Sequence, residues 1–481
     1  MATFLNTVWV VFAAFFLLLG SSSFGSSHPH RPFHHRHLTR RDGGDVPPLQ
    51  ITVGVNTLAP PAGVSRVEQP SNLSAYVTGQ TIDAHAFLLK PGDTPETSNY
   101  FVPDNTIKPG VNLATSYSWK VPASGTTFKT PGGISSGRIY IVDGTLDFST
   151  VGNDGRAIAQ PDPHNPGDIS SRELWGFVEL TYATDATAKK PSIYINLSFV
   201  DWVGMALGMN VTYTDDAGVQ KTLAVPGLKP DGLEKICADL EGRGSFWPKL
   251  CMRSPDNVNK PLRIVSPNKY LSLHPDDSDA ANYYGPYIDQ VWNQYKNTSL
   301  KINTQTSGAS GTTKIDNGVI VSCKVNHETD KLECDNDAGS FARPTSADIY
   351  GCNSGPFANP SVPGESWSRA RVRPRLCAAF VRSTAHLDGA QPSEAIGVDA
   401  YYKWNITHHY SRAVHENLIQ GMGYAFSYDD VSPNNALDAA GLIHVSNPVR
   451  VDLFVNTYGG SGSGSGGANG SVAAAAAAGG A

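Results

Sequence analysis

Two acidic residues stand inside apolar, strand-like segments near the middle of this 481-residue chain. Glu179 lies in WGFVELTY, residues 175–182, and Asp201 directly follows SIYINLSFV, residues 192–200. Acidic side chains are seldom placed in such segments without a partner or a chemical purpose, because burying an unpaired charge is costly. Two carboxyl groups can divide acid and base work in the hydrolysis of a glycosidic bond, one protonating the leaving oxygen and the other activating water.

Alternation along the first segment predicts two faces of a strand. The face that suits a core holds Val178, Leu180 and Tyr182. The other face mixes aromatic, acidic and hydroxyl groups, which suits sugar binding, and it holds Trp175, Phe177, Glu179 and Thr181. In the second segment Asp201 has the parity of the apolar residues, so a strand end or bulge near Val200 must bring it to solvent.

The distance between the two acids depends on how the segments pair, and a hairpin about Ala188–Lys189 leaves two registers open. Pairing Glu179 with Phe199 makes Asp201 a diagonal neighbour at roughly 7–8 Å, within the roughly 6.5–9.5 Å of an inverting glycosidase. Pairing Glu179 with Leu197 leaves the carboxylates about 13 Å apart by strand rise. The alternative is that both acids face the surface or are paired structurally.

The surroundings of the two acids suggest different ionisation. Apolar neighbours such as Phe177 would raise the pKa of Glu179 by disfavouring its charge, as a general acid requires. A wetter strand end suits Asp201, which must stay ionised as the base. Trp202 has the opposite parity to Asp201. We therefore favour a core or groove-wall position for Trp202 over a stacking platform, and keep it as a candidate sugar contact.

Composition and patterning indicate a mainly β protein. Charged residues make up 17% and hydrophobic residues 40%, with 47 glycines, 33 prolines and few long helical patterns. Short alternating or apolar runs between turn clusters predict an all-β barrel or sandwich over 48–222. A mixed α/β region is expected over 223–424, with helices in 231–242, 284–297 and 393–420. Residues 425–458 should return to the barrel, with a last strand at Pro448–Asn456.

Both ends of the chain have biased composition. The apolar run 8–19 predicts a signal peptide over 1–27, with a membrane anchor as the alternative. The His-rich segment 28–41 predicts a propeptide cut after Arg40-Arg41, or else a metal-binding tract. The tail 459–481 is low-complexity Gly/Ser/Ala sequence, or the start of a lipid-anchor signal.

Charge excludes some partners. The net charge is −6, and removal of residues 1–41 with their four arginines makes it −10. An acidic secreted protein is a poor candidate for binding nucleic acid or anionic membranes.

The six cysteines all lie between Cys237 and Cys377. An even number behind a signal peptide predicts disulfides, and six cysteines allow 15 connectivities. We favour sequential pairing because each bond then closes a short loop: Cys237–Cys251, Cys323–Cys334 and Cys352–Cys377. No CxxC pair is present, which argues against a zinc site. Glycosylation sequons begin at Asn72, Asn196, Asn210, Asn297, Asn405 and Asn469, with Asn196 shielded inside its strand segment.

Several segments resemble, in the same order, those of glycoside hydrolase family 64, the thaumatin-like, laminaripentaose-producing β-1,3-glucanases. They span most of Pro48–Tyr458 and include FVELTY, INLSFVDWVGMALGM, GLEKICADLE, YGPYIDQVWNQY, YSRAVHENLIQGMGYAFSYDDV and VRVDLFVN. The resemblance implies a mainly β fold, with a thaumatin-like barrel or sandwich domain and a mixed α/β domain flanking a wide groove. It also implies inverting, endo-type hydrolysis of β-1,3-glucan to short oligosaccharides, with no metal or cofactor.

Carried over by position, the resemblance makes Glu179 the general acid, within FVEL, and Asp201 the general base, within FVDW. Thr181 matches a residue that contacts sugar in the groove. Two departures occur: Ala206 stands where the family has proline, and the connection ATDATAKKPS is longer than in the bacterial enzymes. Neither removes a catalytic group.

Other candidate residues follow. Asp429 and Asp430, in YAFSYDDV, resemble the acidic-cleft segment of thaumatin-like folds and could bind sugar hydroxyls, although such a pair often caps a turn. His408, His409 and His415 do not form HExxH, so we expect a surface or domain-interface role for them in place of a metal site.

Together these features predict a secreted fungal enzyme of the extracellular space or cell wall. We expect a monomeric, disulfide-bonded glycoprotein that hydrolyses β-1,3-glucan, with no nucleic-acid partner and no membrane unless the tail is lipid-anchored. The rival predictions are a non-catalytic glucan-binding protein and a structural wall protein on the same scaffold.

Overall fold

The computed structural model describes residues 46–457, apart from 57–69, 82–83, 93–97, 104–108, 114–115, 152–156, 186–187, 309–317, 360–363 and 434–438. The predicted signal peptide, propeptide and tail lie outside the described residues. The chain forms two compact units. The β unit comprises the described residues of Gly43–Ile195, Met205–Gly232 and Ile443–Ala481, and the α/β unit comprises Asn196–Gly204 and Leu233–Leu442.

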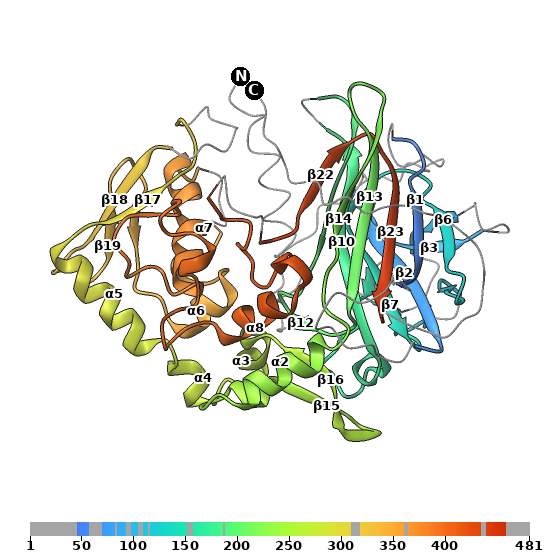
Figure 1. Cartoon of the computed structure of the whole chain (residues 1–481), viewed down its shortest axis with the longest axis horizontal. Coiled ribbons are helices and arrows are strands. Elements are labelled where there is room, and N and C mark those ends of the chain that lie inside the picture. The colour runs from blue at the N-terminus through green and yellow to red at the C-terminus, as the bar shows by residue number, and fades with distance from the viewer. Residues whose placement is uncertain are drawn as a thin grey trace. The chain divides into compact units, whose positions relative to one another are not determined.

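Two large sheets build the β unit (Figure 1). The five-stranded sheet has the order β14 (Gln220–Val225), β13 (Leu207–Thr214), β23 (Pro448–Asn456), β1 (Gln50–Asn56) and β6 (Thr126–Lys129). The larger sheet has the order β22 (Ile443–Ser446), β11 (Pro191–Leu197), β10 (Leu174–Thr184), β7 (Ile134–Asp143), β2 (Leu73–Gln80), β3 (Ala86–Pro91) and β4 (Ser98–Phe101). An eighth strand, β5 (Trp119–Lys120), also pairs with β2, and β8 (Ser149–Val151) pairs separately with β9 (Ala157–Ala159).

The core of the β unit lies between these two sheets. Val178 and Leu180 of β10 are buried, as the alternation predicted. Gly176 lies on the same face of β10, where an added Cβ would come within 3.2 Å of Leu207 on β13. The five-stranded sheet contributes Ile51, Val53, Met209, Val211 and Leu453, which are also buried. One face of β10 therefore packs on the facing sheet, and the opposite face, with Glu179, points away from it.

The α/β unit contains two sheets and seven α-helices among its described residues. One sheet has the order β12 (Trp202–Val203), β16 (Asn257–Val265) and β15 (Cys251–Ser254). The other has the order β20 (Gly339–Phe341), β19 (Leu332–Cys334), β18 (Ile320–Val325), β17 (Leu300–Asn303) and β21 (Ala390–Gln391). The helices are α2 (Gly232–Glu241), α3 (Pro267–Leu273), α4 (Ser278–Asn282), α5 (Gly285–Asn297), α6 (Ser346–Gly351), α7 (Trp367–Val381) and α8 (His409–Asn417).

Helix prediction succeeded where apolar residues recur with a helical period. Helices α2 and α5 match the predicted segments, and α5 buries Tyr287, Val291 and Tyr295 on one side. The predicted helical region 393–420 is mostly irregular, with α8 confined to His409–Asn417 and Tyr402 in a left-handed conformation at φ 59°. Helix α7 escaped prediction because Pro374 stands inside it and its buried face includes arginines.

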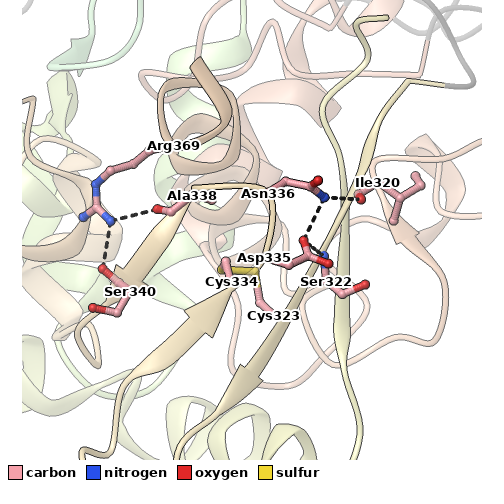
Figure 2. The surroundings of a disulfide bond; sticks show 9 residues. All are labelled: Ile320, Ser322, Cys323, Cys334, Asp335, Asn336, Ala338, Ser340 and Arg369. Carbon is pink, nitrogen blue, oxygen red and sulfur yellow. Dashed lines mark hydrogen bonds between the residues drawn. A yellow bond between two sulfur atoms is a disulfide. The ribbon is translucent and has the colours of Figure 1, made fainter. Parts of the chain in front are cut away.

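All three disulfides have the predicted sequential pairing, and no described cysteine is free. Figure 2 shows Cys323–Cys334, which joins directly opposed residues of β18 and β19. The hairpin is also held through Asp335, whose carboxylate accepts from the Ser322 N–H at 2.9 Å. Arg369 of α7 donates to the carbonyl of Ser340 at 2.8 Å, so a helix secures the neighbouring β20.

The observed units differ from the predicted domain boundaries. The β unit extends to Gly232 instead of residue 222, and the chain returns to it at Ile443 instead of 425. Residues 196–204 belong to the α/β unit although they lie inside the predicted barrel. The reason is their pairing: Ser198 bridges to Tyr424, and β12 pairs with β16. In the described part of the chain, no helix combines the length and apolar character needed to cross a membrane.

Candidate active site

Glu179 lies on β10 directly opposite Arg138 of β7. The guanidinium donates to Glu179 Oε1 twice, from Nη2 at 3.1 Å and from Nε at 3.3 Å. Glu179 is only 5% exposed. The prediction that apolar neighbours surround this carboxyl group was therefore incomplete, because a fixed positive charge is hydrogen-bonded to it.

Aromatic residues form the rest of this face of the sheet. The Arg138 guanidinium lies 4.7 Å from the ring centroid of Phe177, which precedes Glu179 by two residues. Tyr140, two residues after Arg138, has its ring centroid 5.7 Å from those of both Phe177 and Trp175. Burial raises the pKa of Tyr140, and its hydroxyl donates to Gln160 Oε1 at 2.7 Å. Glu179 thus lies among rings and polar groups, as the mixed face of the segment predicted, but these rings are themselves buried.

A bulge on β7 lies next to this surface. Leu180 pairs with Gly137 and Tyr182 with Ile134, so β7 has one extra residue between these pairs. Ser136 supplies it in the left-handed conformation, at φ 48°. Thr181 of β10 lies between the two pairs, and its Oγ1 is buried with no hydrogen-bond partner among the described residues. This hydroxyl shares the strand face of Glu179 and could bond to a ligand group.

Asp201 lies in the α/β unit, in a bend before β12. Strand β11 ends at Leu197, so the predicted strand end near Val200 is present and leaves the Asp201 side chain half-buried. The Asp201 carbonyl accepts from the Ser266 N–H at 2.9 Å. Trp202 pairs with Val265 and is 6% exposed, which fits the core position favoured for it and leaves little ring surface for stacking.

Asp429 does not occupy a sugar-binding position. It is fully buried, and its carboxylate accepts from Arg382 Nη2 at 3.0 Å, His415 Nε2 at 2.8 Å and the Ala425 N–H at 2.8 Å. The structure therefore gives Asp429 an internal structural role in place of the predicted contact with sugar hydroxyls. Asp430 is half-buried, and its negative charge favours the protonated form of Arg375. Asp430 remains a candidate sugar contact.

His408 and His409 are buried in the α/β unit and His415 is half-buried there, so the predicted surface role does not hold for the first two. His408 Nδ1 accepts from the Ser411 N–H at 3.1 Å at the start of α8, and burial lowers the His408 pKa to about 3. Burial also lowers the His409 pKa to about 4. Burial disfavours the charged form of His415, but the Asp429 carboxylate outweighs this and raises the His415 pKa. Within the described ranges, no group of three or more His, Cys, Asp or Glu residues is arranged to hold a metal ion.

Comparison with known proteins assigns this chain to a family. The family model described as Beta-1,3-glucanase, Glyco_hydro_64, matches residues 64–455. The chain belongs to this family. The matched range contains both Glu179 and Asp201. It also runs through both compact units, so the two units together form the family's domain.

Two curated relatives are glucan endo-1,3-beta-glucosidases. The glucan endo-1,3-beta-glucosidase of Cellulosimicrobium cellulans is 26% identical over 329 residues, covering 67% of this chain and 53% of that protein. That of Arthrobacter sp. (strain YCWD3) is 27% identical over 331 residues, with the same two coverages. The chain thus spans about half the length of these curated relatives.

The structural neighbours have the same fold. The crystal structure of a laminaripentaose-producing β-1,3-glucanase in complex with laminaritetraose has a TM-score of 0.65 and 22% identity, covering 86% of this chain and 99% of that chain. The β-1,3-glucanase domain (GH64) from Clostridium beijerinckii has a TM-score of 0.60 and 17% identity, with the same coverages. The mainly β fold class is therefore confirmed.

Arg138 is the functional candidate that sequence reasoning missed. A signal is present in the strand-like run RIYIVDG, residues 138–144, which Arg138 begins with the parity of Tyr140. An arginine and a glutamate in two strands of one sheet are a possible ion pair. Only the strand order and register show that these two residues are opposite each other.

Proposed function

We propose that this protein is an endo-β-1,3-glucanase that hydrolyses laminarin-type glucan with inversion at the anomeric carbon. The observation that carries the proposal is the family match over 64–455, which includes both carboxylates. The setting of Glu179 supports it, since a buried carboxyl group lies on a face of aromatic and hydrogen-bonding side chains. The three disulfides favour action in an oxidising compartment.

In this mechanism Glu179 donates a proton to the glycosidic oxygen as the bond breaks, and Asp201 takes a proton from the attacking water. The bonds from Arg138 end on Oε1 and fix the plane of the Glu179 carboxyl group. A proton on Oε2 is compatible with them, because the neutral acid still accepts at Oε1. The Thr181 hydroxyl would bond to a sugar hydroxyl from the same face. Trp202 is too buried to serve as a stacking platform.

The test uses Glu179→Gln and Asp201→Asn, with Glu333→Gln and Asp216→Asn as matched controls at exposed positions. Each catalytic variant should lose about 10²–10⁴-fold in turnover on laminarin. Glu179→Gln should regain part of its activity on an activated aryl glycoside of suitable length, because a good leaving group needs little protonation. Asp201→Asn should not. Proton NMR of the first products should show α-anomeric ends.

Three outcomes would contradict the proposal. Initial β-anomer would refute inversion. Near-normal turnover by folded Asp201→Asn would refute the base assignment and direct attention to Asp430. Binding of laminarin by the wild-type protein without any new reducing ends would favour the rival, a non-catalytic glucan-binding protein.

A further inference from the structure

The backbone that carries Asp201 is attached to a second segment of the α/β unit, residues 423–429. Tyr424 donates its N–H to the carbonyl of Leu197 at 3.0 Å, and its carbonyl accepts from the Phe199 N–H at 2.7 Å. Ser198 and Tyr424 form a short parallel bridge between these bonds. On the other side of the bend, Ser266 holds the Asp201 carbonyl. The position of Asp201 therefore depends on where residue 424 lies.

Side-chain packing strengthens this attachment. Phe199 is 5% exposed, and a Cβ added to Gly423 would come within 2.8 Å of its ring. Only glycine allows this close approach. The buried Tyr410 of α8 donates its hydroxyl to the Phe199 carbonyl at 2.5 Å. Residues 197–201 are thus fixed by the 423–429 segment and by α8, and small movements of either would reach Asp201.

Asp429 fixes the 423–429 segment from inside. Its Oδ2 accepts from the N–H of Ala425, the residue after Tyr424, and from His415 of α8. Its Oδ1 accepts from Arg382, which follows α7 and also donates to the Asp429 carbonyl at 2.8 Å. Both ring nitrogens of His415 face acceptors, Asp429 at Nε2 and the Gly421 carbonyl at Nδ1. This geometry requires an N–H at each nitrogen and so a protonated imidazole.

We propose that Asp429 is a positioning residue for Asp201, acting through Ala425, Tyr424 and Phe199. This inference rests on the proposed function only for the role of Asp201; the contacts themselves are independent of it. An asparagine at position 429 has one acceptor oxygen and one NH₂ group, so it must turn a donor toward Arg382 or toward Ala425 and His415. The Ala425 N–H would lose its anchor, and the Asp201 carboxylate would shift.

The experiment compares Asp429→Asn with Asp277→Asn in the full chain. Asp277 is a matched control in the same unit: its carboxylate also receives several bonds, from Lys249, Tyr270 and the N–H groups of Asp279 and Ala280. Assays are run well below both melting temperatures. We expect Asp429→Asn to lower kcat on laminarin about 10–100-fold with little change in KM, because a shift near 1 Å can cost that much. Asp277→Asn should lose stability but keep its kcat. Equal kcat losses in the two variants would overturn the proposal.

A double variant shows whether the effect passes through Asp201. In an Asp201→Asn background, adding Asp429→Asn should cost less than threefold in kcat, because the group being positioned is already gone. Multiplicative losses would show that Asp429 acts elsewhere and would overturn the proposal. Tyr410→Phe removes the α8 hydroxyl that donates to the Phe199 carbonyl, so it serves if Asp429→Asn does not fold. It should lower kcat with unchanged KM, and a normal kcat would count against the proposal.

Hydrogen exchange provides a readout that does not need activity. Peptides covering 197–203 should exchange faster in Asp429→Asn than in the wild type, because the Phe199 N–H is bonded to the Tyr424 carbonyl. They should be unchanged in Asp277→Asn. Unchanged protection in Asp429→Asn would overturn the proposal even if activity fell. The proposed function fails if the wild type does not hydrolyse laminarin or if Asp201→Asn keeps its turnover. Hydrogen exchange would still show in that case whether Asp429 fixes residues 197–201.

Discussion

Replacing Arg138 by methionine should move the basic limb of the pH–rate profile to higher pH. The general acid must be protonated to react, so the rate falls as pH rises through the ionisation of Glu179. Arg138 favours the ionised carboxylate, because its Nη2 lies 3.1 Å from Oε1. Methionine keeps an unbranched apolar side chain but removes the guanidinium that lies over Phe177, and with it the charge and both donors. The protonated acid should then persist to higher pH.

The size of the shift follows from the geometry of the ion pair. At 3.1 Å and an effective dielectric constant of about 20, the direct attraction is roughly 5 kcal/mol. Part of this is lost because the guanidinium also loses hydration when it is 12% exposed. An arginine next to a carboxylate commonly changes its ionisation by about 1–3 pH units. We therefore expect the basic limb to move upward by about 1–3 pH units.

The assay is kcat/KM on laminarin between about pH 3 and 9, which reports groups of the free enzyme. Arg138→Lys is the control, since it keeps the charge but loses the paired donor geometry, and its basic limb should stay near that of the wild type. Both variants should lose turnover at the optimum, because the carboxyl plane is no longer fixed. A limb that stays in place or moves to lower pH in Arg138→Met would show that Glu179 is not the acid.

Three further predictions concern stability, thiols and glycosylation. Hydrogen bonds from Lys249 and Tyr270 lower the Asp277 pKa to about 2, so its stabilising effect should vanish as pH falls from about 4 to 2, and melting temperatures of wild type and Asp277→Asn should converge there. Thiol titration of the denatured, unreduced protein should find no free thiol in residues 46–457. Peptide mass spectrometry after expression in a glycosylating host should find glycans at exposed Asn72, Asn297 or Asn405, and none at buried Asn196.

Local patterns predicted the parts of the fold that depend on neighbouring residues. The alternation in β10 predicted the burial of Val178 and Leu180, although Phe177 and Glu179 on its other face are buried as well. Strands β10 and β11 are neighbours in one sheet, as the hairpin required. Short loop lengths also predicted the disulfide pairing. These features involve residues close in sequence, for which periodicity and loop closure are informative.

The same reasoning failed for features that depend on contacts between residues far apart in the sequence. The domain boundary was misplaced because residues 198–199 bond to Tyr424, more than 200 positions away, and no local pattern reports such a bond. Helix α7 was missed because its buried face includes Arg373 and Arg375, whose charges hide the apolar period. Partners elsewhere in the fold, such as Glu365 for Arg373 and Gln305 for Arg375, allow that burial.

Glu179 and Asp429 show most clearly what the sequence alone could not predict. Glu179 and Asp429 both stand among apolar and aromatic residues, and each is paired with an arginine far away in the sequence. Strand pattern and the family resemblance made Glu179 a candidate catalytic acid, and the resemblance of YAFSYDDV to an acidic-cleft segment made Asp429 a candidate sugar contact. Their surroundings separate them: Asp429 is wholly enclosed by donors from α8, from Arg382 after α7 and from its own loop. Glu179 is also buried, at 5% exposed, but it shares its strand face with Thr181, whose hydroxyl has no hydrogen-bond partner among the described residues. A carboxylate saturated on all sides can organise a loop but cannot exchange a proton with a ligand, and this difference is why the structure suggests opposite roles for the two.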